Sequence, residues 1–134
     1  MTFLAGLLAP VLMLFHLAGP VPADLGVSNG ALRDCPTTAH CSSQTWASSD
    51  PMADFSKLSG LVQESPRTVV IDQTETYLHA EASSAFFGFV DDLELFADRD
   101  NNRIQARSES RLGDSDLGVN LSLIHISEPT RLEP

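Results

Sequence analysis

The chain has 134 residues and a formal net charge of −10, with 8 Lys and Arg against 18 Asp and Glu. This length suffices for one small domain with a single hydrophobic core. The acidic balance argues against nucleic acid as a partner, because nucleic-acid-binding domains usually carry a basic stripe. It also argues against electrostatic docking on anionic lipid. A solvated acidic surface identifies no partner by itself, so a protein or a small molecule remains open.

The N-terminus carries an apolar run, residues 3–18, which one proline and one histidine interrupt. The run is short for a membrane span, which needs roughly 20 apolar residues. Val21-Pro22-Ala23 then offers the small-residue spacing that a signal peptidase accepts, so residues 1–23 predict a signal peptide cleaved after Ala23. No Lys or Arg precedes the run, which leaves an uncleaved membrane anchor through residues 3–18 as the alternative. We therefore expect a periplasmic, lumenal or extracellular protein, or a membrane-anchored one.

Residues 24–49 are rich in Gly, Ser, Thr and Pro without an apolar period, which predicts an extended, irregular arm. The arm holds both cysteines of the chain, Cys35 and Cys41. In an exported chain this pair favours a disulfide. A metal site that includes His40, or a redox pair, is the alternative. Metal sites need three or four ligands and the Cys-x-x-Cys spacing is absent, so we predict no metal and no cofactor.

Residues 50–120 predict a small α+β domain. Asp50-Pro51 opens a helix with a capping carboxylate and a proline in the first turn, and Ser65-Pro66 ends it. Apolar residues recur between them at helical spacing: Phe55, Leu58, Leu61 and Val62. Strands are expected at residues 68–71, 77–81, 86–97 and 103–111. The layer rule then predicts one helix packed on an antiparallel meander of about four strands.

The last two strands are expected to form a hairpin, because Asp98-Arg99-Asp100-Asn101-Asn102 is a turn signal. Closing the turn around Asp100-Asn101 places Glu94 opposite Arg107, Leu95 opposite Ala106 and Asp92 opposite Glu109. The opposite charges of Glu94 and Arg107 favour this register, which a one-residue slip would lose. The same stretch imitates a calcium-binding EF-hand loop, but Arg103 stands where that loop needs Gly.

Asp91 and Asp92 lie in the middle of an apolar strand. Because side chains alternate between the two faces of a strand, Asp91 is expected to point toward the core. Ser110 and Arg111 are then its nearest cross-strand groups. A carboxylate in the core must be paired, hydrogen-bonded or protonated. One interpretation is a catalytic carboxylate with a raised pKa, assisted by Arg107 or Arg111. Adjacent strand residues point to opposite faces, so the two aspartates cannot both address one substrate. A structural ion-pair network with Arg107 and Arg111 is favoured.

Residues 113–120 read as a flexible polar loop that follows the last strand. One interpretation is a ligand loop, in which the glycines allow close backbone approach. Its candidate binding residues are Gly113, Asp114, Ser115, Asp116 and Asn120. The alternative is a turn in which Asp116 or Asn120 caps a following helix. The residues do not decide between these two.

Four segments together resemble a known family. They are Asp34-Cys35-Pro36-Thr37-Thr38-Ala39-His40-Cys41-Ser42-Ser43, then Tyr77–Glu81, Phe89–Glu94 and Arg107–Asn120. In this order they resemble the domain-of-unknown-function family numbered 1499 (DUF1499), over residues 26–120. His40 stands where that family usually has Asn, and Ser42 where Val is usual. The resemblance implies a basic, helical segment after Asn120, and it implies no established activity.

Residues 121–131 resemble the codon-by-codon translation of the transposase adaptor used in sequencing libraries, and residues 132–134 would then be the translation of a following barcode. Such a scar is set aside before fold reasoning. Removing residues 121–134 takes away two glutamates and one arginine, leaving 120 residues and a charge of −9. We therefore expect a domain that is truncated after Asn120 and lacks its C-terminal helix.

Function follows only in outline from these features. The first hypothesis is a non-catalytic exported or membrane-tethered accessory domain that binds a protein or a small molecule. The second is a small enzyme that uses Asp91 or Asp92 with Arg107 or Arg111. The third and weakest is redox or metal chemistry at Cys35 and Cys41. An enzyme needs an acid, a partner group and a concave pocket in one place, so side-chain placement discriminates the hypotheses.

Overall fold

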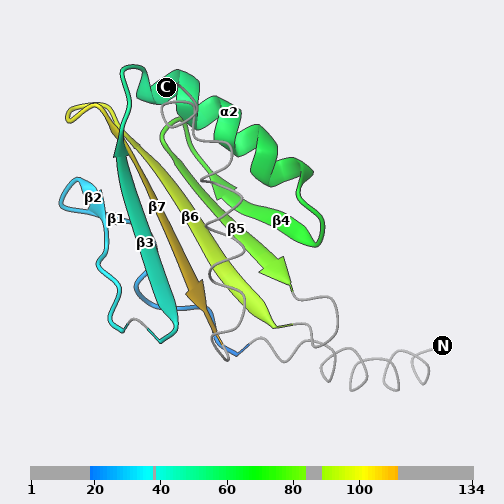
Figure 1. Ribbon diagram of the computed structural model, residues 1–134. Coiled ribbons are helices and arrows are strands. Elements are labelled where there is room, and N and C mark those ends of the chain that lie inside the picture. The colour runs from blue at the N-terminus through cyan, green and yellow to red at the C-terminus, as the bar shows by residue number, and fades with distance from the viewer. Residues whose placement is uncertain (1–18, 38, 84–88, 112–134) are drawn as a thin grey trace, which may run out of the picture.

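The computed structural model describes residues 19–37, 39–83 and 89–111. One helix packs on a five-stranded antiparallel sheet with the order β3-β7-β6-β5-β4, and a two-stranded β1-β2 hairpin lies beside it (Figure 1). The elements are β1 Val27–Ser28, β2 Ala31–Leu32, β3 Cys41–Ala47, α2 Pro51–Glu64, β4 Thr68–Gln73, β5 Tyr77–Ser83, β6 Val90–Asp98 and β7 Arg103–Ser110. The predicted α+β class, with an antiparallel meander and one packed helix, is confirmed.

Helix α2 begins and ends where the sequence predicts. The Asp50 side chain accepts a hydrogen bond from the Ala53 N–H at 3.1 Å, and Pro51 occupies the first turn, where its missing N–H costs nothing. Ser65 leaves the helical conformation and donates its N–H to the Val62 carbonyl. Between these caps, the apolar stripe lies against the sheet, with Leu58 and Val62 at 1% and 2% exposure.

Loss of the N-terminal cap gives a first testable expectation. Asp50→Ala removes the acceptor for the Ala53 N–H, so we expect the free energy of unfolding to fall by about 1 kcal/mol. Asp50→Asn keeps a capping oxygen and should stay close to the wild type. Urea denaturation of both variants measures the difference, and equal losses in the two would show that the cap is not the cause.

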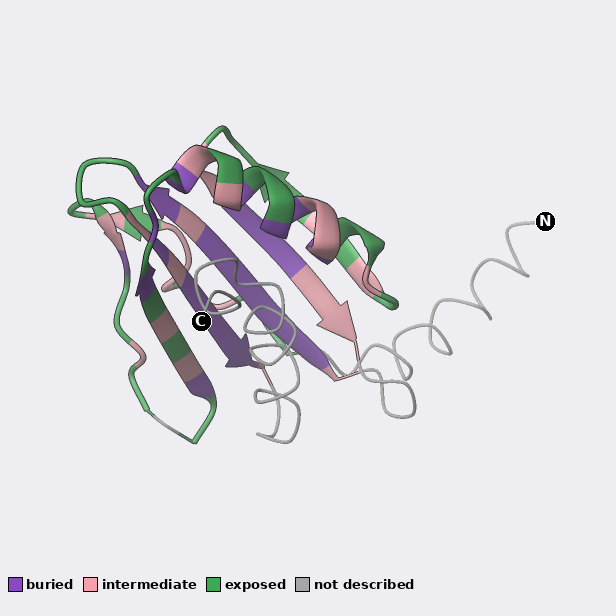
Figure 2. Cartoon of the chain, turned by 45° about the horizontal axis from the view of Figure 1, so that its top comes forward, coloured by how far each residue is buried: buried purple, intermediate pink, exposed green. Residues whose placement is uncertain are grey.

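The hydrophobic core lies between α2 and one face of the sheet. Figure 2 shows the central strands buried along most of their length, while the outer surface of the helix is exposed. The helix and every strand of the five-stranded sheet except β4 supply buried apolar side chains: Trp46, Phe55, Leu58, Val62, Leu78, Ala80, Leu93, Leu95, Ala97, Ile104 and Ala106. On β6 these are the odd-numbered positions, so its even-numbered residues face the other side of the sheet.

The hairpin of β6 and β7 has the predicted register. Glu94 is paired with Arg107, Leu95 with Ala106 and Asp92 with Glu109. Asp98 accepts hydrogen bonds from the Asn101 side chain and from Arg103, the residue that replaces the glycine of a calcium-binding loop. The segment is therefore a hairpin turn closed by its own side chains.

The prediction of an irregular arm over residues 24–49 is wrong for its last third. Residues 41–47 form β3, which pairs along its whole length with β7, from Cys41 opposite Glu109 to Ala47 opposite Arg103. The strand lies at the edge of the sheet, and most of its residues remain partly or fully exposed (Figure 2). An edge strand needs no apolar alternation, and a run with one large apolar residue, Trp46, therefore gave no signal.

Candidate functional site

The face of the sheet opposite α2 carries charged side chains, yet it is buried. We call it the charged face; its residues are Tyr77, His79 and Glu81 on β5, Asp92 and Glu94 on β6, and Arg107 and Glu109 on β7 with Arg111 just after it. Glu94, Asp92 and Arg107 are no more than 1% exposed. Burying charges is costly unless they are paired and hydrogen-bonded, so their partners decide what this face can do.

Arg107 is the centre of a first cluster. Its Nη2 atom donates to Asp24, which arrives from the N-terminal arm. Its Nη1 atom donates to the Glu94 Oε1 atom at 3.2 Å and lies 3.6 Å from the Glu109 Oε1 atom. One guanidinium thus faces three carboxyl groups. The second oxygen of Glu94 accepts from the Tyr77 hydroxyl at 2.6 Å, so the carboxylate is fully engaged.

The excess of acid in the Arg107 cluster is relieved by a shared proton. Burial raises the pKa of Glu109 to about 7, assisted by its hydrogen bond with Asp24 and opposed by Arg107. The pKa of Asp24 is lowered in spite of burial, because it bonds Glu109 and faces the charge of Arg107. Glu109 therefore holds its proton in mildly acidic solution, donates it there to the Asp24 carboxylate, and is about half protonated near pH 7.

These opposite shifts predict how stability depends on pH. Glu109 binds its proton more tightly when folded, so its contribution is present below pH 4.5 and is lost as the pH rises through about 7. Asp24 and Asp92, with lowered pKa values, contribute above pH 3.8 and lose that contribution as the pH falls. We expect the free energy of unfolding of the full chain to decline from about pH 5 to about pH 8, and Glu109→Gln to remove most of that decline. Urea denaturation across this range tests it, and an unchanged slope in the variant would contradict it.

Arg111 is the centre of a second cluster. Its Nε and Nη2 atoms donate to the two oxygens of Asp92 at 2.8 and 2.9 Å, and Nη2 also donates to Glu81 at 2.7 Å. The Nε2 atom of His79 lies 2.7 Å from the Asp92 Oδ1 atom. Although burial opposes it, these hydrogen bonds from Arg111 and His79 lower the pKa of Asp92, so the group is an anion held by two donors.

The same cluster contains the described residues whose spacing would suit a metal ion. One ligand atom each from His79, Glu81 and Asp92 lies within 4.8 Å of the others. The Arg111 guanidinium already bridges Glu81 and Asp92, and its own pKa is raised by the hydrogen bond with Asp92. A divalent cation would have to displace this resident positive charge.

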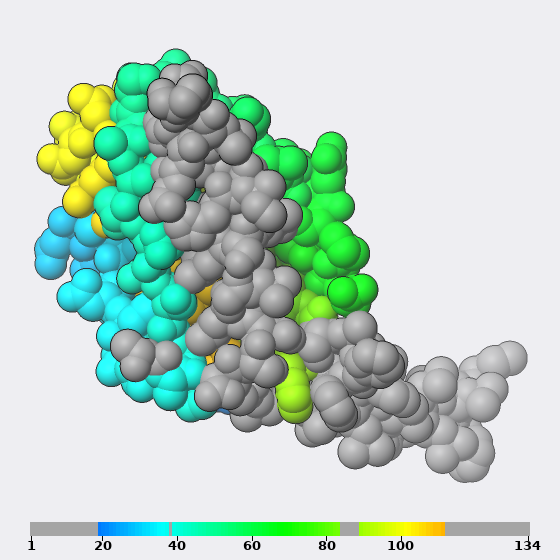
Figure 3. Space-filling view, in the orientation of Figure 1, coloured from blue at the N-terminus to red at the C-terminus, as the bar shows by residue number. Residues whose placement is uncertain are grey.

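The N-terminal arm covers the Arg107 cluster of the charged face. The Gly26 N–H donates to the Glu94 Oε2 atom at 2.7 Å, and the Leu32 N–H donates to the Gln105 Oε1 atom at 3.0 Å. The β1-β2 hairpin turns through Asn29 and Gly30, both at positive φ, and its Leu32 side chain is buried. Figure 3 shows the hairpin, in blue, against the yellow β6-β7 turn.

A disulfide joins the arm to the sheet. Cys35 and Cys41 are bonded, with their Cα atoms 5.4 Å apart, and Cys41 is the first residue of β3. The predicted pairing is therefore present, and both thiols are consumed by it. The bond fixes the end of the irregular segment next to the strand that follows it.

The structure brings together three of the four catalytic candidates. Asp92, Arg107 and Arg111 lie on the charged face and belong to the two ion-pair clusters, as the network interpretation predicts. Asp91 lies on the other face, 4% exposed, with Ser110 as its cross-strand partner. The loop candidates Gly113, Asp114, Ser115, Asp116 and Asn120, residues 1–18 of the leader and residues 121–134 all lie outside the described residues.

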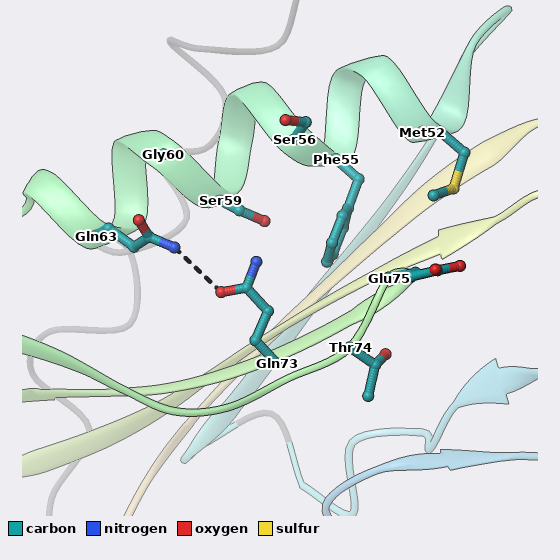
Figure 4. Close-up of a pocket in the computed structure, with 9 residues that line it drawn as sticks. All are labelled: Met52, Phe55, Ser56, Ser59, Gly60, Gln63, Gln73, Thr74 and Glu75. Atoms are coloured by element: carbon teal, nitrogen blue, oxygen red, sulfur yellow. Dashed lines mark hydrogen bonds between the residues drawn. The ribbon is translucent and has the colours of Figure 1, made fainter.

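Sequence reasoning missed a groove between α2 and the β4-β5 turn. It has a volume of about 420 Å³, and a hydrogen bond of 3.1 Å from Gln63 to Gln73 joins its two walls (Figure 4). Its lining residues are Met52, Phe55, Ser56, Ser59, Gly60, Gln63, Gln73, Thr74 and Glu75. None of the predicted site residues lines the groove. Most of its polar lining residues are uncharged, and they form no motif that a single sequence reveals.

The fold and the charged face define a small α+β domain with two ion-pair clusters on one face of its sheet, the first of which is contacted by its own N-terminal arm. Residues 24–126 match the family model described as "Protein of unknown function (DUF1499)", which covers most of the chain, and the protein belongs to this family. The match extends six residues beyond Asn120, into the segment that resembles adaptor sequence. No curated protein and no solved structure matches the chain. Within the described ranges, no helix is long and apolar enough to cross a membrane.

Proposed function

We propose that the protein is a non-catalytic accessory domain, exported or tethered to a membrane through residues 3–18, that binds a protein or a small molecule. The observation that carries this proposal is the mutual engagement of the charged face. Arg107 is committed to three carboxyl groups and Arg111 to two, and the arm lies over the first cluster. Groups that neutralise one another in a buried interface stabilise the fold and are poorly placed to meet a substrate.

The disulfide supports the exported setting. Structural disulfides persist in oxidising compartments and are rare where thiols are kept reduced. Cys35 and Cys41 close a short loop in a domain of about one hundred residues, a size at which such a crosslink adds useful stability. The leader and the disulfide thus both favour a domain that is exported from the cytoplasm.

Thiol counting in cells tests the setting. The full chain, with its leader, is expressed and quenched in acid, and free thiols are labelled with a mass-shifting maleimide before and after reduction. We expect no labelled cysteine before reduction and two after it, in material recovered outside the cytoplasm. Two free thiols in protein that fractionates with the cytoplasm would overturn the exported setting.

The enzyme alternative rests on the hydrogen bond between His79 and Asp92, which resembles a base held by an orienting carboxylate. Diethyl pyrocarbonate distinguishes the two proposals, because it modifies imidazoles that a small molecule can reach. His40 is exposed and His79 is 6% exposed, so His40 serves as the internal control. In the non-catalytic account His79 reacts far more slowly than His40 in the folded protein. Equal rates would mean an open site and would favour the enzyme that uses Asp92 with Arg111.

A further inference from the structure

The Arg107 cluster holds more carboxyl groups than cations. Asp24 from the arm, Glu94 from β6 and Glu109 from β7 all face Arg107, and Asp92 of β6 adds a fourth carboxyl group within electrostatic reach of Glu109. The positive charge nearest to Asp92 is already used, because Arg111 and His79 bond it. On the other side of Glu109, strand β3 places Cys41 opposite it. Cys41 supplies no charge there, because it is bonded in the disulfide. A second cation beside Asp24 and Glu109 would reduce this excess of negative charge.

The backbone of Asp24 lies at the required place. Its N–H bonds its own carboxylate, the group that also receives Arg107 and the proton of Glu109. The peptide bond before it follows Val21 and Ala23, the two small residues that a signal peptidase reads, and both are exposed. The family match also begins at residue 24, the residue that cleavage would leave as the new terminus.

We propose that processing cleaves the bond between Ala23 and Asp24 and that the α-ammonium group freed on Asp24 acts as a second cation in the Arg107 cluster. Cleavage is hydrolysis: the C–N bond breaks, water gives its hydroxyl to the Ala23 carbonyl carbon, and the nitrogen of Asp24 gains a proton and then a second from solvent. An α-amino group has an ordinary pKa of about 7.7–8.0, and neighbouring carboxylates favour its charged form. This inference rests on the proposed export, which supplies the peptidase.

The consequence is a change in the ionisation of Glu109. Before cleavage, the cluster holds a proton between Glu109 and Asp24. After cleavage, the α-ammonium takes over that role and stabilises both carboxylates. Maturation thereby strengthens the attachment of the arm to the charged face at neutral pH, where the unprocessed chain has begun to lose the shared proton.

Carbon-detected NMR titration of the Glu109 carboxyl group tests the charge assignment in three proteins. One begins at Asp24 with a free amine, one begins at Asp24 with an acetylated amine, and one retains residues 19–23; all continue to residue 134. We expect the Glu109 midpoint near 7 in the acetylated and extended proteins, and at least one unit lower, a tenfold change in proton affinity, in the free-amine protein. The acetylated protein matches it in length and differs in charge alone. Equal midpoints in all three would overturn the inference.

N-terminal sequencing of protein recovered from exporting cells tests the cleavage position independently. We expect Asp24 as the first residue. Exported protein with a different first residue would overturn this inference and leave the proposed function standing. Protein that is retained in the cytoplasm with reduced thiols would overturn the proposed function, while the titration would still report whether an α-ammonium on Asp24 acts on Glu109.

Discussion

Replacing Arg107 with leucine is expected to lower the free energy of unfolding by about 3–5 kcal/mol, the cost of removing one partner from a buried ion pair. The side chain is 1% exposed and faces Asp24, Glu94 and Glu109. Among the described residues, leucine would leave the Glu94 carboxylate, itself fully buried, with the Tyr77 hydroxyl and the Gly26 N–H as donors. Urea denaturation measures the loss, and a loss below about 1 kcal/mol would contradict the account.

Two further variants separate charge from packing in this experiment. Arg99→Leu removes an arginine from the exposed hairpin turn and should change stability by less than about 0.5 kcal/mol. The double variant Arg107→Leu with Glu94→Leu removes both partners of the buried pair. It should recover part of the loss in stability, because the fully buried Glu94 carboxylate is no longer left without its arginine. A double variant less stable than Arg107→Leu alone would show that volume, and not charge, dominates.

Replacing Leu58 with alanine is expected to lower the free energy of unfolding by about 2–5 kcal/mol. Leu58 is 1% exposed at the centre of the contact between α2 and the sheet, and truncation removes buried methyl groups and leaves a cavity. Leu61→Ala, on the same helix at a half-buried position, makes the same chemical change with the same helix propensity. Leu61→Ala should lower the free energy of unfolding clearly less than Leu58→Ala does. Equal losses in the two variants would contradict the placement of Leu58 in the hydrophobic core.

The helix and the β6-β7 hairpin could be predicted from sequence because several local signals agreed. For α2 these were the Asp50-Pro51 start, the apolar period and the Ser65-Pro66 stop. For the hairpin they were the turn residues and the pairing of Glu94 with Arg107. β3 was not predicted, because its position is determined by pairing with β7 and an exposed edge strand carries no apolar alternation.

The candidate site was predictable in part for the same reason. The register alone placed Glu94 beside Arg107 and Asp92 near Arg111, and both ion pairs are present. The role of His79 could have been found by extending the parity argument to the neighbouring strand, since His79 lies opposite Glu94. The role of Asp24 could not, because it depends on the path of an irregular arm whose contacts lie 83 residues away along the chain.

In the folded protein the arm covers the Arg107 cluster, and the proposed non-catalytic role depends most on this contact. Amide hydrogen exchange at Gly26, whose N–H donates to the Glu94 carboxylate, tests this claim directly. We expect this amide to be protected to a degree comparable with the central β6 and β7 amides, although it belongs to a segment with little regular structure. Exchange at the rate of an unstructured peptide would mean that the arm leaves Arg107 and Glu94 open to a ligand, and would contradict the non-catalytic account.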